Sequence, residues 1–156
     1  MDRLTKVQRS GLMSRVRQRG TELERRLRSE LRRRGVRYRA NVKLPGTPDI
    51  AIASGKIAVF VDGCFWHGCP AHGTMPKTNE EFWRRKIYRN KERDTEVATA
   101  LRGLGWKPVR VWEHEIKKST DRVADRLCAL AAKRIFFIEA QKSLSKRKKD
   151  TGYRTR

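Results

Sequence analysis

Apolar residues recur at helical spacing in three stretches of the chain, and this pattern predicts three helices. The first, residues 21–35, opens with a capping box made by Thr21 and Glu24. The second spans about 79–104 and begins after an asparagine that can cap it. The third begins near Thr120 and places three apolar residues on one face: Val123, Leu127 and Leu130.

Three shorter stretches are typical of strands. Residues 50–53 are one predicted strand, and residues 56–62, which contain the apolar run 57–61, are the next; a Ser-Gly turn separates them, so we expect a hairpin. Residues 106–112 form the third predicted strand, between the second and third helices. Elements in this order predict an α/β fold, in which helices flank a small central mixed β-sheet.

Length and charge restrict the class of protein. The 156-residue chain has the length of one ordinary domain, and its 39 Lys and Arg residues against 17 Asp and Glu give a net charge of +22. Such a charge indicates a polyanionic partner, either nucleic acid or an anionic surface. The sequence has neither an apolar run of membrane-spanning length nor an apolar signal region, so we expect a cytoplasmic protein without a membrane partner. Residues 141–156 are polar and basic, which predicts a disordered tail after a single domain, 1–140.

A metal site is predicted at the end of the second strand. Cys64, Cys69 and His72 lie within nine residues, and His114 follows the third strand as the fourth ligand. Two cysteines and two histidines are a donor set that structural zinc prefers. The alternative is a pair of reduced cysteines in a loop beside a surface histidine. Cys128 is expected to take no part.

A second site is predicted from carboxylates. In a strongly basic protein that binds a polyanion, carboxylates near the bound surface would repel it unless a cation lies between them. Asp49 enters the first strand of the hairpin, where it would lie near a backbone carbonyl at the end of the second strand and near His67. One carboxylate and one backbone carbonyl are enough protein ligands for Mg²⁺, because this ion keeps several of its water ligands. His67 would then act as general base.

Each acidic candidate also has a structural alternative. Glu24 would serve only in the capping box, Asp62 would be an ordinary turn residue before a glycine, and Asp49 would be a solvated charge at a strand edge. Asp94 shares a helix face with apolar residues and would need a partner if that face is buried. Aromatic side chains near these positions either pack in the core or insert between DNA bases; they are Phe65, Trp66 and Trp83.

The chain resembles the very-short-patch repair (Vsr) DNA mismatch endonucleases over roughly residues 13–130. The motifs that carry the resemblance, by their order and spacing, are Pro48-Asp49, the run 60–67, Glu81-Phe82-Trp83, Glu92-Arg93-Asp94, and Gly105-Trp106 through Trp112-Glu113. The resemblance implies a restriction-endonuclease-like fold with a structural zinc. It also implies Mg²⁺-dependent nicking of one DNA strand on the 5′ side of the thymine in T:G mismatches, which arise when 5-methylcytosine deaminates.

The resemblance also implies residue roles. Asp49 matches the family's metal-binding aspartate, with the Val61 carbonyl as a second metal ligand, and His67 matches its catalytic histidine. Glu24 and Asp94 match supporting acidic residues. Four residues match positions that contact DNA, the last of them in a basic N-terminal segment, 1–20: Phe65, Trp66, Trp83 and Met13.

Two departures from better-known family members bear on the site. Those members carry threonine and histidine where this chain has Val61 and Asp62, so a second catalytic histidine is replaced by a carboxylate. They also carry a cysteine at the position of His114. The resemblance further implies a bacterial, nucleoid-associated monomer with functional links to a cytosine-5 DNA methyltransferase and to mismatch-repair proteins.

Three other functions stay open at this point. A zinc-stabilised DNA-binding module without catalysis would explain the charge, the zinc ligands and the aromatics, but not the combination of Asp49, His67 and Asp94. A nuclease of the same fold would act on other mismatched, modified or fully paired DNA. The basic tail would alternatively anchor the protein to RNA or ribosomes.

Overall fold

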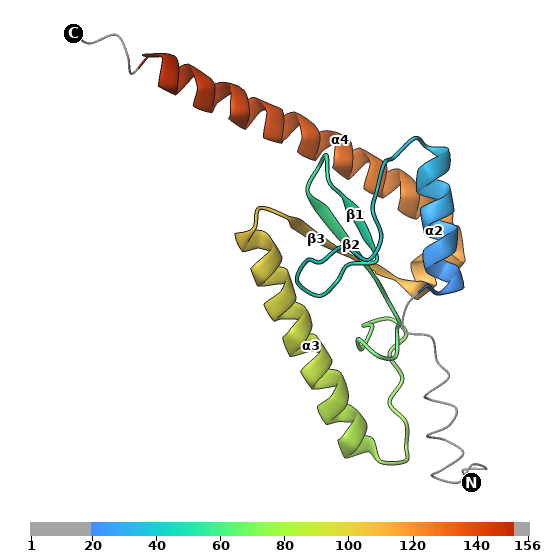
Figure 1. Ribbon diagram of the computed structural model, residues 1–156. Helices are drawn as coiled ribbons and strands as arrows, with labels where there is room; N and C mark the ends of the chain where they lie inside the picture. The colour runs from blue at the N-terminus through green and yellow to red at the C-terminus, as the bar shows by residue number, and fades with distance from the viewer. Residues whose placement is uncertain (1–19, 152–156) are drawn as a thin grey trace.

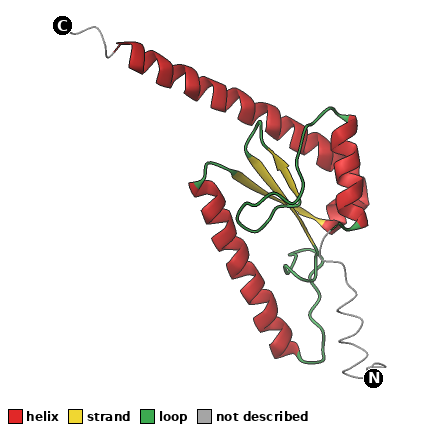
Figure 2. Cartoon of the chain, viewed as in Figure 1, coloured by secondary structure: helices red, strands yellow, loops and turns green. Residues whose placement is uncertain are grey.

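The computed structural model describes residues 20–151, so Met13 and the predicted N-terminal segment lie outside the described residues. Strands gather between the helices (Figure 2). Across residues 20–151, no helix has the length and apolar character needed to cross a membrane. The elements in chain order are α2 (Glu22–Arg33), β1 (Ile50–Ile52), β2 (Ile57–Asp62), α3 (Glu80–Gly103), β3 (Lys107–Trp112) and α4 (Glu113–Thr151).

The sheet has three strands in the order β1-β2-β3. β1 and β2 form an antiparallel hairpin with Ile50 opposite Val59, as the sequence predicts. β2 and β3 run parallel, with Ile57 beside Lys107 and Asp62 beside Trp112. A parallel pair requires a crossover connection, and α3 lies in it. The prediction of a small mixed sheet flanked by helices is confirmed.

Both faces of the sheet are covered by helices. α2 and α4 lie together against one face and α3 lies on the other (Figure 1). Side chains of β2 therefore alternate between two hydrophobic clusters. The larger cluster joins α2, the sheet and α4, and it includes Leu27, Leu31, Ile50, Ile57, Val59, Val111, Ile116 and Leu127. The smaller one joins the sheet and α3 through Ala58, Phe60 and Leu101.

Two helix starts show how well local signals predict boundaries. The capping box of α2 is present, since Glu24 N–H donates to the Thr21 hydroxyl and Glu24 accepts in return from the Thr21 N–H. α3 begins after Asn79 as predicted, but this residue is left-handed, with φ 55°, and makes no capping hydrogen bond through its side chain. Asparagine tolerates that backbone conformation, which explains its place at the turn.

α4 differs from the predicted third helix at both ends. It begins at Glu113, directly after β3, and is interrupted at Ser119, whose backbone is not helical. The Ser119 hydroxyl accepts a hydrogen bond from the Arg122 N–H at 3.3 Å, so the predicted start near Thr120 marks the second segment. α4 then continues to Thr151 (Figure 1). Residues 141–151, which the sequence predicts to be disordered, lie in this helix instead, because Gln, Lys, Leu and Arg predominate there and neither Gly nor Pro interrupts them.

Replacing Leu127 by Ala should lower the free energy of unfolding by about 2–5 kcal/mol, because the side chain is fully buried and its loss leaves a cavity. Leu144 lies on the same helix and is 60% exposed, so Leu144→Ala is the matched control and should change stability by less than about 0.5 kcal/mol. Urea denaturation monitored by circular dichroism measures both. Equal losses would show that α4 does not pack on the sheet through Leu127.

Candidate active site and metal centre

The candidate residues meet where β2 and β3 end. Because the two strands are parallel, their carboxyl ends lie at the same edge of the sheet. The 63–79 loop leaves β2 at this edge, and α4 begins there directly after β3. Cys64 and His114, which are 50 positions apart in the chain, are thereby brought into contact.

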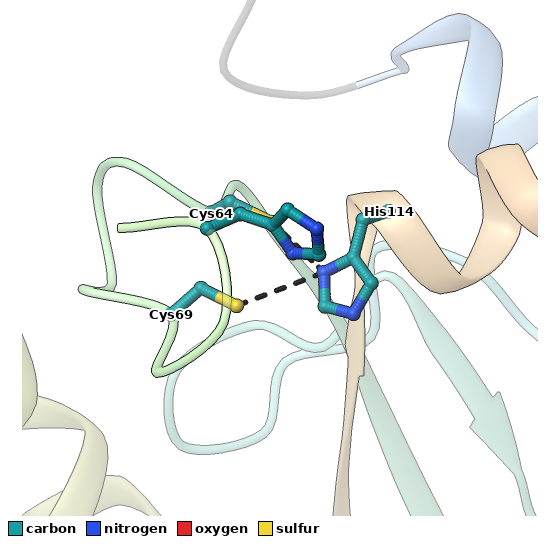
Figure 3. Close-up of side chains that lie close together, drawn as sticks. Cys64, Cys69 and His114 are labelled. Atoms are coloured by element: carbon teal, nitrogen blue, oxygen red, sulfur yellow. Dashed lines mark hydrogen bonds between the residues drawn. The ribbon is translucent and has the colours of Figure 1, made fainter. Parts of the chain in front are cut away.

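Four potential metal ligands converge at this edge: Cys64, Cys69, His72 and His114. One ligand atom from each lies within 4.8 Å of all the others. His114 Nδ1 lies 3.1 Å from Cys64 Sγ and 3.6 Å from Cys69 Sγ (Figure 3). Ligand atoms at the corners of a tetrahedron around zinc would be separated by about 3.5 Å. The predicted set of four is therefore assembled, and it could hold a metal ion.

Backbone hydrogen bonds shape the loop that carries the cysteines. Cys69 N–H donates to the Cys64 carbonyl at 2.8 Å, and Gly73 N–H donates to the Cys69 carbonyl at 2.7 Å. The Cys64 N–H donates to Glu113 Oε1 at 2.9 Å, which ties the loop to the first residue of α4. Burial opposes ionisation of Glu113, but this bond and Lys117 outweigh it and hold the pKa below its ordinary value.

Asp49 lies beside the end of β2. Its Oδ2 accepts a hydrogen bond from the Val61 N–H at 2.8 Å. The N–H and C=O of one strand residue point to the same side of the strand, so the Val61 carbonyl also faces Asp49. The pKa of Asp49 is raised to about 6: burial is the largest cause, the Val61 hydrogen bond and the charge of Arg28 lower the pKa in part, and the charges of Glu24 and Asp62 add to the rise.

His67 lies between two carboxylates. Its Nδ1 is 2.6 Å from Asp94 Oδ2, and its Nε2 is 3.8 Å from Asp62 Oδ1. An ionised carboxylate only accepts hydrogen bonds, so Nδ1 carries the proton shared with Asp94. Nε2 of the neutral ring is then a proton acceptor that faces the end of β2.

Arg110 on β3 connects the same two carboxylates and was not predicted from the sequence. Its guanidinium contacts Asp62 Oδ2 at 2.5 Å and Asp94 Oδ1 at 2.8 Å. A signal was present, because a charged residue between two valines of a predicted strand needs a partner once helices cover both faces of the sheet. The sequence could not say which carboxylate lies opposite, since that depends on the register of β2 and β3.

The structure settles two alternatives for the acidic residues. Asp62 is not an ordinary turn residue: it is the last residue of β2, is 3% exposed and pairs with Arg110. The strand continues through Asp62 because that residue lies beside Trp112 of β3. Asp94 needed a partner within the apolar face of α3, and it has two, His67 and Arg110. That expectation is confirmed.

Glu24 combines a structural position with closeness to Asp49. It accepts from the Gly20 and Thr21 N–H groups and pairs with Arg28 at 2.5 Å, with only 3% of its surface exposed. Its charge nevertheless contributes to the raised pKa of Asp49. The capping box and a place beside the acidic site are therefore compatible.

Comparison with known proteins bears on this arrangement. Residues 1–72 match the family described as DNA mismatch endonuclease Vsr. The Type II nicking enzyme V.NaeI of Lentzea aerocolonigenes is 45% identical over 76% of this chain and 76% of its own length. The chain belongs to the Vsr family of DNA endonucleases. The DNA mismatch endonuclease Vsr of Escherichia coli (strain K12) is 34% identical, over 81% of this chain and 88% of its own.

A solved structure is also similar to this Vsr-family chain. The catalytic domain of the homing endonuclease I-Bth0305I aligns with a TM-score of 0.49 and 18% identity, covering 74% of this chain and 99% of that domain. The restriction-endonuclease-like classification of the Vsr-family fold stays a prediction at this level of similarity.

The aromatic residues expected from the Vsr resemblance form one cluster. Ring centroids of Phe65 lie 5.1 Å from those of both Trp66 and Trp83, and the two tryptophans are 5.8 Å apart. Asn90 of α3 donates to the Trp66 carbonyl at 2.8 Å and so anchors the loop to the helix. All three rings are partly exposed, so they pack on one another and also face solvent.

Replacing Asp49 by Asn should stabilise the protein in magnesium-free buffer at pH 7.5 but not at pH 4. The unfolded state releases the Asp49 proton near its ordinary pKa of 3.8 and the folded state only near 6. The ionised side chain therefore destabilises the native state above pH 6, and this penalty is absent below 3.8. After a discount for solvent screening, the gain should be about 1–2 kcal/mol.

Urea denaturation at both pH values measures this effect. Asp121→Asn, at a side chain that is 70% exposed, is the control and should show no such dependence. An equal change at pH 4 and pH 7.5 for Asp49→Asn would contradict a raised pKa of Asp49.

Proposed function

We propose that this Vsr-family endonuclease nicks one DNA strand on the 5′ side of the thymine in T:G mismatches, in a magnesium-dependent reaction. The observation that carries the proposal is the 2.6 Å contact between His67 Nδ1 and Asp94, which leaves the other ring nitrogen facing Asp62 at the end of β2. The names of two relatives support this proposal: V.NaeI is called a nicking enzyme, and the Escherichia coli relative is called a DNA mismatch endonuclease.

Asp49 and the Val61 carbonyl would hold the magnesium ion. Both are hard oxygen donors, and the neighbouring charges of Glu24 and Asp62 make the spot favourable for a cation. When bound, Mg²⁺ supplies polarisation of the phosphoryl group and neutralises charge on the leaving oxygen. With a pKa of about 6, Asp49 is ionised at neutral pH and available as a ligand.

His67 would activate the attacking water. Nε2 accepts a proton from the water as its oxygen bonds to phosphorus, and Asp94 stabilises the resulting imidazolium through Nδ1. The bond from phosphorus to the 3′ oxygen of the preceding nucleotide breaks, and that oxygen takes up a proton from solvent. Glu24 would orient water around Asp49 while it also caps α2.

The aromatic cluster and the basic charge would bind the substrate. Phe65, Trp66 and Trp83 would insert beside the mismatch, where a mispaired step costs less to open than a paired one. Arginines and lysines would hold the phosphates through salt-dependent contacts. Met13 would contact DNA from the N-terminal segment, which lies outside the described residues. A methyltransferase link and the monomeric state are proposed on the resemblance alone.

Zinc would occupy the cluster of Cys64, Cys69, His72 and His114. Four soft or borderline protein ligands leave no open position, which is typical of a structural ion. Bound there, zinc would hold the 63–79 loop against the start of α4. His67 and two of the aromatic residues lie on the same loop, so their orientation would depend on the ion.

A duplex containing one T:G mismatch should be nicked on the thymine strand in the presence of Mg²⁺, and matched T:A and C:G duplexes in the same flanks should stay intact. Asp49→Ala and His67→Ala should each lower the single-turnover rate by about 10²–10⁴-fold. Asp121→Ala, at an exposed side chain whose ion pair is with Arg34, should keep the wild-type rate. Denaturing gels of end-labelled duplexes measure all of these.

Tight binding of the T:G duplex without any nicking would favour a non-catalytic DNA-binding module. Equal nicking of T:A or C:G duplexes would instead indicate a nuclease of the same family with a different substrate. Either outcome would overturn the proposed specificity.

The purified protein should contain one zinc ion per chain. Cys64→Ser and His114→Ala should each reduce the zinc content to a small fraction and lower the melting temperature, because the loop loses its cross-link to α4. Cys128→Ser is the matched control and should retain zinc, since this residue lies outside the cluster. Atomic emission measures the metal. Full zinc content in His114→Ala would remove that residue from the ligand set.

A further inference from the structure

One arginine joins the two carboxylates that flank His67. The guanidinium of Arg110 contacts Asp62 through Nη1 and Asp94 through Nη2, so a single planar fork holds both. The Phe60 ring lies beneath it, with 5.2 Å from Arg110 Cζ to the ring centroid. This contact restrains the plane of the guanidinium.

Burial explains why such a connection is needed. The side chains of Asp62 and Asp94 are 4% and 16% exposed, and the Arg110 side chain is 27% exposed. Carboxylates removed from water at this level need a charged partner to remain ionised in place. Arg110 supplies it from β3, and parallel pairing of Phe60 with Arg110 sets its position.

The geometry between Asp62 and His67 has a chemical meaning. His67 Nε2 and Asp62 Oδ1 lie 3.8 Å apart. With the ring proton on Nδ1, both atoms are acceptors and cannot bond to each other. At separations above 3.5 Å, a water molecule can bridge two polar atoms. One water molecule can donate a hydrogen bond to each acceptor at this separation.

We propose that Asp62 is a catalytic residue that holds the attacking water together with His67, and that Arg110 is the positioning residue that keeps Asp62 and Asp94 in place. The proposal rests on the proposed endonuclease function. The water donates one proton to His67 Nε2 as its oxygen bonds to phosphorus and the bond to the 3′ oxygen breaks. Asp62 keeps its hydrogen bond throughout and takes no proton.

A different use of Arg110 is the main alternative. The pocket formed by Asp62, His67 and Asp94 is also lined by Lys91 and Arg102, and a basic pocket of this kind attracts DNA phosphates. If Arg110 contacted a phosphate directly, its loss would weaken DNA binding and lower the salt dependence of binding. If it positions carboxylates, its loss would lower the rate on bound DNA.

Three variants separate these possibilities: Asp62→Asn, Arg110→Met and Arg110→Lys. With enzyme in saturating excess over the T:G duplex, we expect Asp62→Asn and Arg110→Met each to lower the single-turnover rate by about 100-fold, with DNA affinity within about threefold of wild type. Arg110→Lys keeps the charge without the fork, and we expect partial rescue, to within about 10-fold of wild type. The single-turnover rate of the double variant Asp62→Asn/Arg110→Met should lie within about threefold of the rate of the slower single variant. The two effects should not multiply, because both changes act on the same water molecule.

Arg134 provides a matched control. Its guanidinium also bridges two acceptors, the carbonyls of Gly55 and Gly105, but at the opposite end of the sheet. Arg134→Met should keep the wild-type rate. Thermal melting of each variant shows whether it folds, and where Arg110→Met does not fold, Asp62→Asn and Arg110→Lys decide the question.

The proposal is overturned if Asp62→Asn nicks at the wild-type rate, if Arg110 variants lose DNA affinity without losing rate, or if the double variant loses the product of the two single effects. Failure of the proposed function has a different signature, because the wild-type protein itself would then leave the T:G duplex intact.

Discussion

Parallel pairing of β2 with β3 is the interaction on which the candidate site depends. The register that puts Asp62 beside Trp112 also puts Phe60 beside Arg110, so the ion pairs of Arg110 follow directly from it. The same register starts α4 next to the 63–79 loop and thereby brings His114 to the two cysteines. A shift by one residue would turn Arg110 to the other face of the sheet and would separate both groups.

Charge is distributed unevenly in a way that suits phosphate chemistry. The chain has a net charge of +22, yet the edge of the sheet gathers three aspartates, Asp49, Asp62 and Asp94. Arg110 compensates two of them internally, and Asp49 retains a raised pKa of about 6. A Vsr-family endonuclease can thus attract DNA over its surface and still present a spot that favours a cation. Fixed dipoles and charges of this kind need little rearrangement during reaction.

Much of this arrangement could be predicted from the sequence, and the exceptions share a cause. Elements with a local signal, such as the capping box at Thr21 or the hairpin around Ser54, were predicted correctly, and the clustering of the four cysteine and histidine side chains was predicted from their spacing. Arg110 and the burial of Asp62 were missed because both depend on strand register, which local patterns do not encode. Residues 141–151 are helical where disorder was predicted, because their charge concealed helix-forming residues.

The tautomer of His67 is the most direct test of how the site works. The chain has only three histidines, so long-range ¹H–¹⁵N spectra of the imidazole rings can be assigned with a His67→Asn variant. In the neutral ring, we predict a protonated Nδ1 and an unprotonated Nε2, with the Nδ1 signal altered by Asp94→Asn. A proton on Nε2 in the wild-type protein would contradict the assignment of this nitrogen as the general base.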